Sequence, residues 1–482
     1  MSEKPNSTQL AVVGGGPGGY AAAFLAADLG LKVALIDNEL NPGGVCLYRG
    51  CIPSKALLHA ARVLTEAREA ANWGIQFAEP KIDLGKLRAW KDSVVQKLTG
   101  GLGILSKQRK VDYIRGRASI LDPATLRIEK HGGGEDRLVF EHAILATGSR
   151  PAAIPDFPPN SDRVLDSTSA LDLKRVPKSL LVVGGGYIGL EMATVYAALG
   201  SKVTVVEMLP RLLPGGVDGD LVAILAKRME KICARVLVST KVAGMKEQKD
   251  GIYVKLEGAQ APAEEVVFDQ VLVAVGRKPN SQIAGLENTQ VKVDARGFIE
   301  VDLQRRTAEP AIYAIGDVAG EPMLAHKASH EGFAAVEAIA GHKVAFEPRA
   351  IPAVVFTDPE VAWCGLTEDQ AKAEGRAVAV ARFPWAASGR AITLDRPDGL
   401  TKLVIDPETE RVLGVGIVGT GAGELIAEGV LAVEMAAFAS DVRLSIHPHP
   451  TLSETVMESA EVFFGQSTHV YRPKKSPAMP AR

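Results

Sequence analysis

The chain has 482 residues, of which 46% are hydrophobic and 23% charged, and its formal net charge is −2. A chain of this length predicts three or four globular domains. The near-neutral charge gives no electrostatic basis for binding nucleic acid or an anionic membrane, and no apolar run approaches the ~18 residues of a membrane span.

The N-terminus and the cysteine content indicate a reducing compartment. Residues 1–10 have neither the apolar core of a signal peptide nor the arginines of an organellar leader, so we expect a cytoplasmic protein. Four cysteines are too few for a disulfide scaffold. A close pair in such a compartment indicates metal binding or catalysis.

The first pattern along the chain is a strand, a glycine-rich turn, a helix and a second strand. A strand is predicted at 9–13, a helix at 20–29 and a strand at 32–37, around the run Gly14-Gly15-Gly16-Pro17-Gly18-Gly19. In a dinucleotide-binding unit, Gly14 would allow the turn, Gly16 would let a pyrophosphate approach, and Gly19 would let helix and strand pack closely. Asp37, which ends the second strand, would accept hydrogen bonds from a ribose.

Two cysteines follow this unit directly, in the segment GGVCLYRGCIPSK that spans 43–55. Pro53 and an amphipathic pattern to about residue 67 place Cys51 at a helix N-terminus, where the helix dipole favours a thiolate. An irregular start to this helix would bring the sulfurs of Cys46 and Cys51 into bonding range. The alternatives are a pair of buried structural thiols or a metal site, but the spacing is not CxxC and His59 fits an ordinary helix residue.

The same strand–turn–helix–strand pattern recurs later in the chain. A strand is predicted at 179–183, a helix at 190–199 and a strand at 202–207, around the run Gly184-Gly185-Gly186-Tyr187-Ile188-Gly189. One GxGxxG run is a weak signal, but two copies between strand and helix predict two dinucleotide sites. Glu207 ends the second strand and would repel a 2′-phosphate, with no arginine before Arg211, so NAD is favoured over NADP. The alternative for Glu207 is a solvated acid at the end of a strand.

From about residue 347 the pattern changes to an α+β domain without a glycine fingerprint. Strands are predicted at 353–356, 401–405 and 411–418, and helices at 367–374 and 422–438, whereas the tail 472–482 is expected to be frayed. The run HPHPTLSE at 447–454 carries the second chemical signature. Thiol–disulfide exchange needs a proton acceptor, and histidine titrates near pH 7. Glu454 could orient an imidazole, while His131, His142 and His469 are expected to be loop or packing residues.

These motifs together resemble the class I pyridine nucleotide–disulfide oxidoreductases over nearly the whole chain. GGVC(x4)CIPSK resembles the redox disulfide of that family, although Tyr48-Arg49 stands where Asn-Val is common in its dihydrolipoamide-oxidising branch. The C-terminal run also matches the family pattern HxHPTLSE. Other stretches that resemble the family are Ala146-Thr147-Gly148, Gly276-Arg277-Lys278-Pro279-Asn280, Ala314-Ile315-Gly316-Asp317 and Met323-Leu324-Ala325-His326.

The resemblance implies an α/β fold with two Rossmann-like dinucleotide-binding domains and a C-terminal α+β dimerisation domain. The expected domains are an FAD-binding domain at 1–150, an NAD-binding domain at 151–279, a central domain completing the FAD site at 280–349, and an interface domain at 350–482. A homodimer with FAD and NAD as cofactors, and with active sites shared between subunits, is expected. No metal is expected.

The resemblance also implies residue roles. Cys51 would be the flavin-proximal, charge-transfer thiol and Cys46 the interchange thiol that meets the substrate. Lys55 would pair with Glu191 beside the flavin N5. His449 would be the base of the other subunit's site, with Glu454 as its partner, and Asp317 would bind the ribityl chain. The implied cofactor-binding residues are Gly14, Gly16, Gly19, Asp37, Lys55, Ala118, Thr147, Gly148, Asp317, Ala325, Gly184, Gly186, Gly189, Glu207, Val242 and Gly276.

Other members of the family fit less well. A mercuric reductase or a large thioredoxin reductase would need a C-terminal cysteine pair, and no cysteine follows Cys364. Glu207-Met208 argues against an NADPH-dependent glutathione reductase. Soluble transhydrogenases and disulfide-free NADH oxidases would not keep both Cys46 and Cys51, and a nonenzymatic role would need damaged sites.

The expected activity is therefore the oxidation of protein-bound dihydrolipoamide by NAD+ through a Cys46–Cys51 disulfide and FAD. No lipoyl segment precedes the flavin unit, so the lipoyl group is expected on another protein. That partner would be the acyltransferase of a 2-oxo acid dehydrogenase complex or the carrier of a glycine cleavage system. Neither nucleic acid nor a membrane is expected as a partner.

Overall fold

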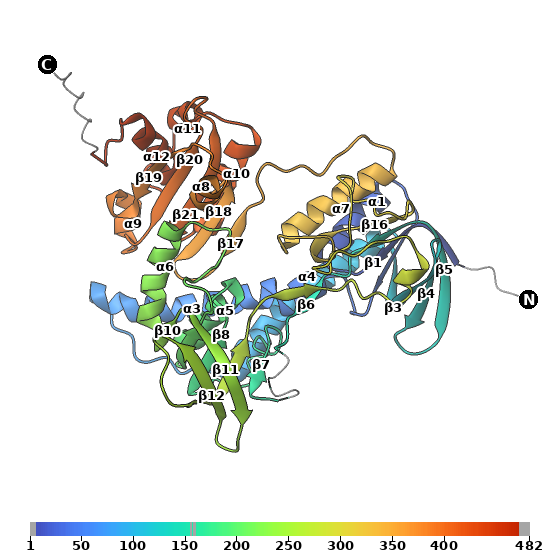
Figure 1. Cartoon of the computed structure of the whole chain (residues 1–482), viewed down its shortest axis with the longest axis horizontal. Coiled ribbons are helices and arrows are strands. Elements are labelled where there is room, and N and C mark those ends of the chain that lie inside the picture. The colour runs from blue at the N-terminus through green and yellow to red at the C-terminus, as the bar shows by residue number, and fades with distance from the viewer. Residues whose placement is uncertain (1–5, 155–156, 158–160, 472–482) are drawn as a thin grey trace, which may run out of the picture. The chain divides into compact units, whose positions relative to one another are not determined.

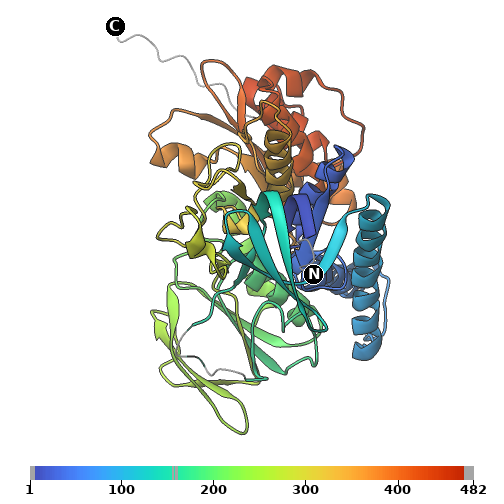
Figure 2. The same cartoon turned by 90° about the vertical axis from the view of Figure 1, so that its right-hand side faces the viewer.

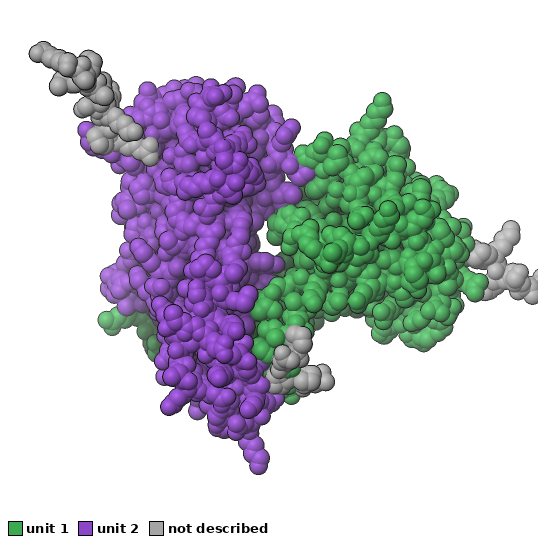
Figure 3. All heavy atoms as spheres, viewed as in Figure 1, with its two compact units in different colours: residues 1–60, 76–175, 272–347 green, residues 61–75, 176–271, 348–482 purple. Residues whose placement is uncertain are grey.

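The computed structural model describes residues 6–154, 157 and 161–471, so the tail expected to be frayed lies outside the described residues. The chain forms two compact units (Figure 3). Unit 1 contains residues 1–60, 76–175 and 272–347, and unit 2 contains residues 61–75, 176–271 and 348–482. Among the described helices, none combines the length and apolar character needed to cross a membrane.

The sheet of unit 1 is built around the first predicted βαβ unit. Its strands are β1 (Asn6–Val13), β2 (Val33–Asp37), β3 (Asp112–Asp122), β4 (Thr125–Lys130), β5 (Glu135–Leu145) and β16 (Ile312–Ala314). β1 pairs in parallel with β2 and β5, and β5 pairs in parallel with β16, whereas β3, β4 and β5 pair antiparallel. Figure 2 shows the antiparallel strands together in cyan and teal.

Both faces of β1 are covered, which explains why the strand is a continuous apolar run. Leu10 and Val12 pack with residues of α1 (Pro17–Asp28) and α7 (Ala325–Ile339), which lie side by side in Figure 1. Ala11 and Val13 point to the opposite face and pack with residues of β3, β4 and β5. The sheet therefore separates two apolar layers, with the glycine-rich turn at the carboxyl end of β1.

The remaining elements of unit 1 include the two helices that carry the cysteine segment. These elements are α2 (Gly44–Arg49), α3 (Cys51–Glu69, which continues into unit 2), α4 (Leu84–Gln108), β6 (Ser149–Pro151), β7 (Val164–Leu165), β15 (Arg277–Pro279), η2 (Leu286–Asn288) and η3 (Gly316–Val318). β6 and β15 form a two-stranded antiparallel ribbon.

Unit 2 contains the second βαβ unit. One of its sheets contains the strands β10-β9-β8-β14 in this order, and β9 pairs in parallel with β8 and β10. A separate antiparallel sheet has the order β11-β12-β13. The elements are η1 (Ala70–Trp73), β8 (Ser179–Val183), α5 (Tyr187–Ala198), β9 (Lys202–Val206), α6 (Gly219–Ile232), β10 (Arg235–Leu237), β11 (Thr240–Glu247), β12 (Ile252–Gly258), β13 (Val266–Phe268) and β14 (Gln270–Val273).

The C-terminal part of unit 2 is an α+β domain. Its antiparallel sheet has the order β17-β18-β21-β20-β19. The elements are β17 (Ala353–Val355), β18 (Glu360–Gly365), α8 (Glu368–Ala373), β19 (Ala379–Pro384), η4 (Trp385–Ala387), α9 (Gly389–Thr393), β20 (Leu400–Ile405), β21 (Val412–Gly419), α10 (Ala422–Glu434), α11 (Ala439–Leu444) and α12 (Glu454–Phe464).

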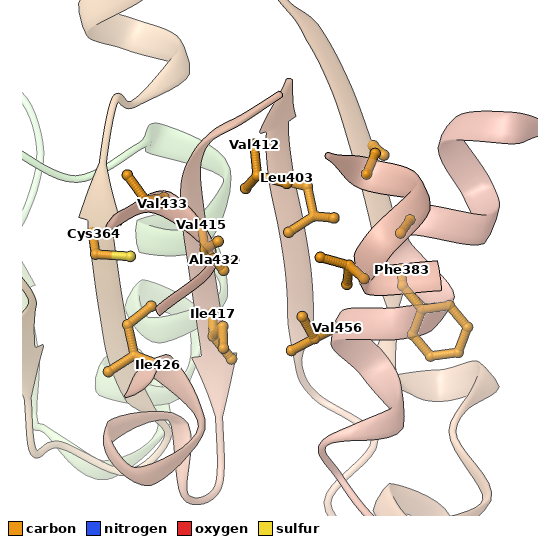
Figure 4. Close-up of a cluster of buried hydrophobic side chains, with 14 of the residues drawn as sticks. Cys364, Phe383, Leu403, Val412, Val415, Ile417, Ile426, Ala432, Val433 and Val456 are labelled. Carbon is orange, nitrogen blue, oxygen red and sulfur yellow. The ribbon is translucent and has the colours of Figure 1, made fainter. Parts of the chain in front are cut away.

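The core of this domain lies between the sheet and its helices. Figure 4 shows Leu403 and Ile417 from the sheet with Ile426 of α10 and Val456 of α12. Cys364 belongs to the same apolar cluster and is 1% exposed, so it behaves as a small core residue. The α/β fold with two Rossmann-like domains and a C-terminal α+β domain is confirmed, while the boundaries of the four proposed domains stay a prediction.

The predicted helix at 422–438 is wrong at its C-terminal end, because α10 ends at Glu434. Ala436 has a φ of 52°. The Ala437 amide donates to Ala432 O at 2.9 Å and the Ala436 amide to Val433 O at 3.1 Å. These bonds satisfy the last carbonyls of the helix with alanine at a position that glycine usually occupies. No glycine or proline therefore marks the end.

A buried ionic cluster joins α6 to the C-terminal domain within unit 2. Lys402 is 1% exposed at its side chain, and its Nζ lies 2.8 Å from Asp218, 3.0 Å from Asp220 and 2.9 Å from Glu368. Although burial opposes it, Lys402 and Arg382 hold the pKa values of the Asp220 and Glu368 carboxyls below their usual range. Burial likewise opposes the charge of Lys402, but the carboxylates raise its pKa.

Candidate active site

The first glycine-rich turn has room for a phosphate. Gly14 has a φ of 107°, and a Cβ there would lie 2.3 Å from Ala146 O. A Cβ on Gly19 would lie 1.8 Å from Gly14 O, whereas a Cβ on Gly16 would meet nothing within 4 Å. The N-terminus of α1 has no side-chain cap, so its backbone amides face this open space. The turn fits the pyrophosphate of a dinucleotide.

Asp37 is fixed by the same turn. Its Oδ2 accepts a hydrogen bond from the Gly15 amide at 2.6 Å, and its Oδ1 accepts one from the Glu39 amide at 2.8 Å. Burial raises the pKa of the Asp37 carboxyl, and the backbone amides of Gly15 and Asn38 and the charge of Arg49 oppose this rise. Each carboxylate oxygen has a further lone pair for a ribose hydroxyl.

The second turn repeats this geometry residue by residue. Gly184 has a φ of 110°. A Cβ on Gly189 would lie 2.1 Å from Gly184 O, and a Cβ on Gly186 would meet nothing within 4 Å. Glu207 is 7% exposed and accepts hydrogen bonds from the Gly185 amide at 2.7 Å and the Leu209 amide at 2.8 Å. The two turns therefore provide two equivalent dinucleotide cradles, one in each unit.

An open hollow of about 520 Å³ follows Glu207 in the chain, lined by Leu209, Pro210, Arg211, Pro214 and Gly215. The Arg211 guanidinium lies 3.0 Å from Asp369. This arginine is already paired with a carboxylate, and Glu207 stands at the position whose side chain accepts hydrogen bonds from the ribose hydroxyls. The arrangement suits a free 2′-hydroxyl better than a 2′-phosphate.

The motif 146–148 is locked to the motif 276–280. Thr147 Oγ1 donates to Asn280 O at 2.9 Å, Asn280 Nδ2 donates to Thr147 O at 2.9 Å, and the Asn280 amide donates to Gly148 O at 2.9 Å. Gly148 has a φ of 69° and Gly276 one of 117°. Both glycines are therefore in the left-handed region, which few other residues adopt.

Asp317 is held on two sides. Ser149 Oγ donates to its Oδ2 at 2.5 Å, and Arg277 Nε donates to Ser149 Oγ at 2.7 Å. The preceding Gly316 amide donates at 2.6 Å to Glu331, which is fully buried. This fixed carboxylate suits hydrogen bonds from the hydroxyls of a ribityl chain.

Three other predicted cofactor residues have surroundings that do not indicate a role. Ala118 is half-buried in β3, where it pairs with Ile128. Val242 is half-buried in β11, beside a register shift that ends at Gly244. Ala325 is the first residue of α7. Their assignment to cofactor binding stays a prediction.

The two redox cysteines lie at the junction of two helices. Cys46 is half-buried in the first turn of α2, and Cys51 is the exposed first residue of α3, as Pro53 predicts. Both are in the reduced form, and their side chains form a hydrogen bond. This bond, burial and the charge of Cys51 raise the pKa of the Cys46 thiol, against the opposing effect of Lys55. Cys46 is therefore the cysteine of the pair whose thiol proton is held more firmly than usual.

The cysteine segment packs directly on the first dinucleotide turn. The Gly43 amide donates to Gly15 O at 2.7 Å, and a Cβ on Gly44 would lie 2.4 Å from the Gly16 Cα. Tyr20 of α1 lies near enough to the thiols to interact with them. Burial and the charges of the two cysteines raise the pKa of its hydroxyl. Sequence reasoning missed Tyr20, and its only signal is its place in the first turn of α1.

The two histidines of the C-terminal run differ sharply in exposure. His449 Nδ1 lies 2.9 Å from Glu454 Oε1, and its side chain is 74% exposed. Glu454 is the first residue of α12, and its other oxygen accepts the Thr451 amide at 2.7 Å. Although partial burial opposes it, the Thr451 amide and His449 hold the pKa of Glu454 below its usual range. By contrast, the His447 side chain is 8% exposed and pairs with Glu428 at 2.7 Å.

The expected Lys55–Glu191 pair spans the two units and stays a prediction. Lys55 lies on α3, one helical turn after Cys51. Glu191 lies on α5, is 3% exposed, and accepts the Phe356 amide at 3.1 Å. Within the described residues, no group of three or more histidines, cysteines or acids is arranged to hold a metal ion.

Comparison with known proteins identifies the family. Residues 8–332 match the model of the pyridine nucleotide-disulphide oxidoreductases, and residues 351–460 match the dimerisation domain of the same family. The chain belongs to the pyridine nucleotide-disulphide oxidoreductases. This oxidoreductase uses FAD and NAD, as the two cradles predict, and its dimerisation domain supports a homodimer.

Relatives of this oxidoreductase match it over nearly their full length. It is 51% identical to a dihydrolipoyl dehydrogenase of Vibrio parahaemolyticus, over 96% of this chain and 97% of the relative. It is 48% identical to a dihydrolipoyl dehydrogenase of Thermus scotoductus, over 96% and 98%. The crystal structure of LpdA from Mycobacterium tuberculosis is similar, with a TM-score of 0.87, 27% identity, and coverage of 94% of this chain and 99% of that one. The HOCl-induced flavoprotein disulfide reductase RclA from Escherichia coli has a TM-score of 0.83, 27% identity, and coverage of 95% and 99%.

Proposed function

We propose that this oxidoreductase is a dihydrolipoyl dehydrogenase, which oxidises protein-bound dihydrolipoamide and reduces NAD+. The observation that carries the proposal is the hydrogen-bonded Cys46–Cys51 pair, which is held against the first dinucleotide turn through the Gly43–Gly15 backbone bond. Relatives that are 51% identical over 96% of the chain bear this name, which supports the same activity here.

The sulfur chemistry follows from the placement of the two cysteines, with Cys46 as the sulfur that meets the substrate. In the oxidised enzyme a substrate thiolate attacks Cys46 Sγ, a bond forms between them, and the Cys46–Cys51 bond breaks with its electron pair on Cys51. The second substrate thiolate then attacks the substrate sulfur of this mixed disulfide, and Cys46 leaves with a proton. Lipoamide is released, and the cysteine pair has gained two electrons.

His449 is proposed as the base that takes the protons of the two substrate thiols. Its exposed ring keeps one nitrogen for the substrate while Nδ1 faces the ionised Glu454. The dimerisation domain covers both residues. We propose that His449 serves the site of the other subunit, so that each active site takes its cysteines from one subunit and its base from the other.

Two cofactors complete the reaction. Gly14, Gly16, Gly19, Asp37 and Asp317 would hold FAD, and Gly184, Gly186, Gly189 and Glu207 would hold NAD. Bound FAD supplies a two-electron acceptor for the dithiol and a hydride donor to NAD+. Lys55 and Glu191 would provide a charged pair beside the flavin.

The proposed partners are lipoyl-bearing proteins, either an acyltransferase of a 2-oxo acid dehydrogenase complex or a glycine cleavage carrier. The name of the relatives supports this class of partner. A cytoplasmic location is proposed because two of the four cysteines are buried thiols and the other two form the redox pair.

An assay that compares substrates tests the proposal. The purified holoenzyme should oxidise dihydrolipoamide with NAD+ and should fail to produce oxidised glutathione with either nicotinamide cofactor. Cys46→Ser should lose this activity with FAD still bound, because the change leaves the dinucleotide turn intact. Turnover with glutathione that matches turnover with dihydrolipoamide would contradict the substrate assignment.

A further inference from the structure

Tyr48 and Arg49 are the two residues of the cysteine segment that depart from the usual Asn-Val. Both lie at the end of α2, and both side chains reach back to the loop that follows β2. The Tyr48 hydroxyl donates to Asn41 O at 3.0 Å and accepts the Asn41 amide at 3.2 Å. One side chain therefore satisfies both backbone groups of a single loop residue.

Arg49 makes a second tie to the same loop through an ion pair with Glu39. The Glu39 amide donates to Asp37 at 2.8 Å, and the Tyr113 hydroxyl donates to Glu39 O at 3.0 Å. The loop after β2 is therefore held at Asp37, Glu39 and Asn41. Through this loop the end of α2 is connected to Asp37, the acid expected to bind the ribose at the first dinucleotide site.

α2 needs such support because it has only six residues, with Gly43 before it and Gly50 after it. A single helix of this length is not stable alone in water. The Tyr48 ring packs close to the chain, since a Cβ on Gly43 would lie 3.1 Å from Tyr48 Cε2. Packing and hydrogen bonds at Tyr48 thus act on the same short helix that carries Cys46.

We infer that Tyr48 and Arg49 are positioning residues that hold α2 against the loop after β2 and thereby aim Cys46 at Cys51. This inference rests on the proposed function, in which Cys46 and Cys51 exchange with the substrate. Tyr48 has the larger effect, because its hydroxyl makes two hydrogen bonds to backbone. The Arg49–Glu39 pair is 39% and 29% exposed at its side chains, where ion pairs contribute little.

The measurable consequence is the pH profile of the thiolate–flavin charge-transfer band in the two-electron-reduced holoenzyme. Within unit 1, Cys46 on α2 and Tyr20 on α1 interact with Cys51, and Lys55 on α3 interacts with Cys46. In the proposed function Cys51 is the charge-transfer thiolate and accepts the hydrogen bond of the Cys46 side chain, and a loosened α2 weakens that bond. The thiolate is then protonated at a higher pH, so the midpoint for loss of the band moves upward.

Tyr48→Phe is the test variant, because it keeps the ring and removes both hydrogen bonds. We expect its midpoint to rise by about half a pH unit, roughly threefold in proton affinity, and hydrogen exchange of the α2 amides to become about 5- to 10-fold faster. Arg49→Gln should shift the midpoint less. Tyr253→Phe is the matched control, because its hydroxyl bonds Asp250 at 2.9 Å in unit 2 and it should leave both readings unchanged.

The outcomes separate the inference from the proposed function. An unshifted midpoint in Tyr48→Phe, or an equal shift in Tyr253→Phe, overturns the inference. A wild-type enzyme without the band refutes the proposed function, while the exchange rates still decide whether Tyr48 holds α2. If Tyr48→Phe fails to load FAD, the double variant Tyr48→Asn/Arg49→Val carries the test, since it restores the usual pair and should show the same upward shift.

Discussion

Replacement of His449 by glutamine separates the proposed base from the rest of the site. Loss of a general base lowers a rate by typically 10²–10⁴-fold. The loss should fall on the steps in which the dithiol attacks or leaves. Reduction of the flavin by NADH involves no thiol proton and should stay fast. Because the His449 ring is 74% exposed, its replacement removes little packing, and the protein should remain folded.

Glu454→Gln provides a graded perturbation of the same pair. It keeps the base but removes the charge that faces Nδ1 at 2.9 Å. A hydrogen bond to a charged group contributes about 1.5–3 kcal/mol, and exposure of the ring reduces this to about 1 kcal/mol, or roughly fivefold in rate. Glu454→Gln should therefore impair the dithiol step much less than His449→Gln does.

The assay is anaerobic rapid mixing of oxidised enzyme with dihydrolipoamide, and in parallel with NADH. His447→Gln is the matched control, because it removes a histidine–glutamate pair two residues away that is buried rather than exposed. It should lower the melting temperature and leave the dithiol step within a few-fold of wild type. Equal losses in the dithiol and NADH reactions of His449→Gln, or an equal loss of the dithiol step in His447→Gln, would refute the assignment of the base.

Three further predictions follow from the two cradles and the ionic cluster. Gly16→Ala should fold but lose FAD, and Gly186→Ala should keep FAD and bind NADH at least tenfold more weakly, because each Cβ enters space left for a phosphate. Absorbance measures the bound FAD and calorimetry measures NADH binding. Normal cofactor binding in either variant would count against this reasoning. Glu207→Gln should reduce the preference for NAD over NADP about tenfold in kcat/KM, and an unchanged ratio would exclude Glu207 as the selector. Lys402→Met should lower the free energy of unfolding by about 3–5 kcal/mol, because it removes the cation that pairs with the buried Asp218 carboxylate. Lys241→Met, on an exposed pair, should change it little. The cluster's contribution to the free energy of unfolding should be lost in acid, as the pH falls through the lowered pKa values of Asp220 and Glu368, which lie below the ordinary 3.8 and 4.5. It should also be lost above pH 10.5, as Lys402 deprotonates. Equal acid sensitivity of wild type and Lys402→Met would argue against this.

Steric rules made the two cradles predictable from sequence. Gly14 and Gly184 need a positive φ, and Gly19 and Gly189 leave no room for a Cβ, so the glycine spacing alone locates both turns. The place of Cys51 at a helix N-terminus was predictable for a similar reason, because Pro53 is tolerated only in the first turn.

Features that depend on long-range packing were not predictable. The end of α10 relies on Ala436 in a left-handed conformation, where alanine gives no signal. His447 and His449 are each followed by a proline, so the sequence does not distinguish them. Only the burial of the His447 ring against Glu428 does so. The Tyr48 hydroxyl meets Asn41 through a fold of the loop that no local pattern encodes.

The most direct test of the redox assignment is anaerobic titration of the oxidised holoenzyme with one equivalent of dihydrolipoamide, followed by absorbance. Wild type should develop the long-wavelength thiolate–flavin band in proportion to the added dithiol, because electrons enter through Cys46 and the charge settles on Cys51. Cys46→Ser should hold FAD, show the band before any substrate is added, and remain unchanged on titration. Flavin reduction by dihydrolipoamide in Cys46→Ser at a rate near that of wild type would contradict the role of the cysteine pair.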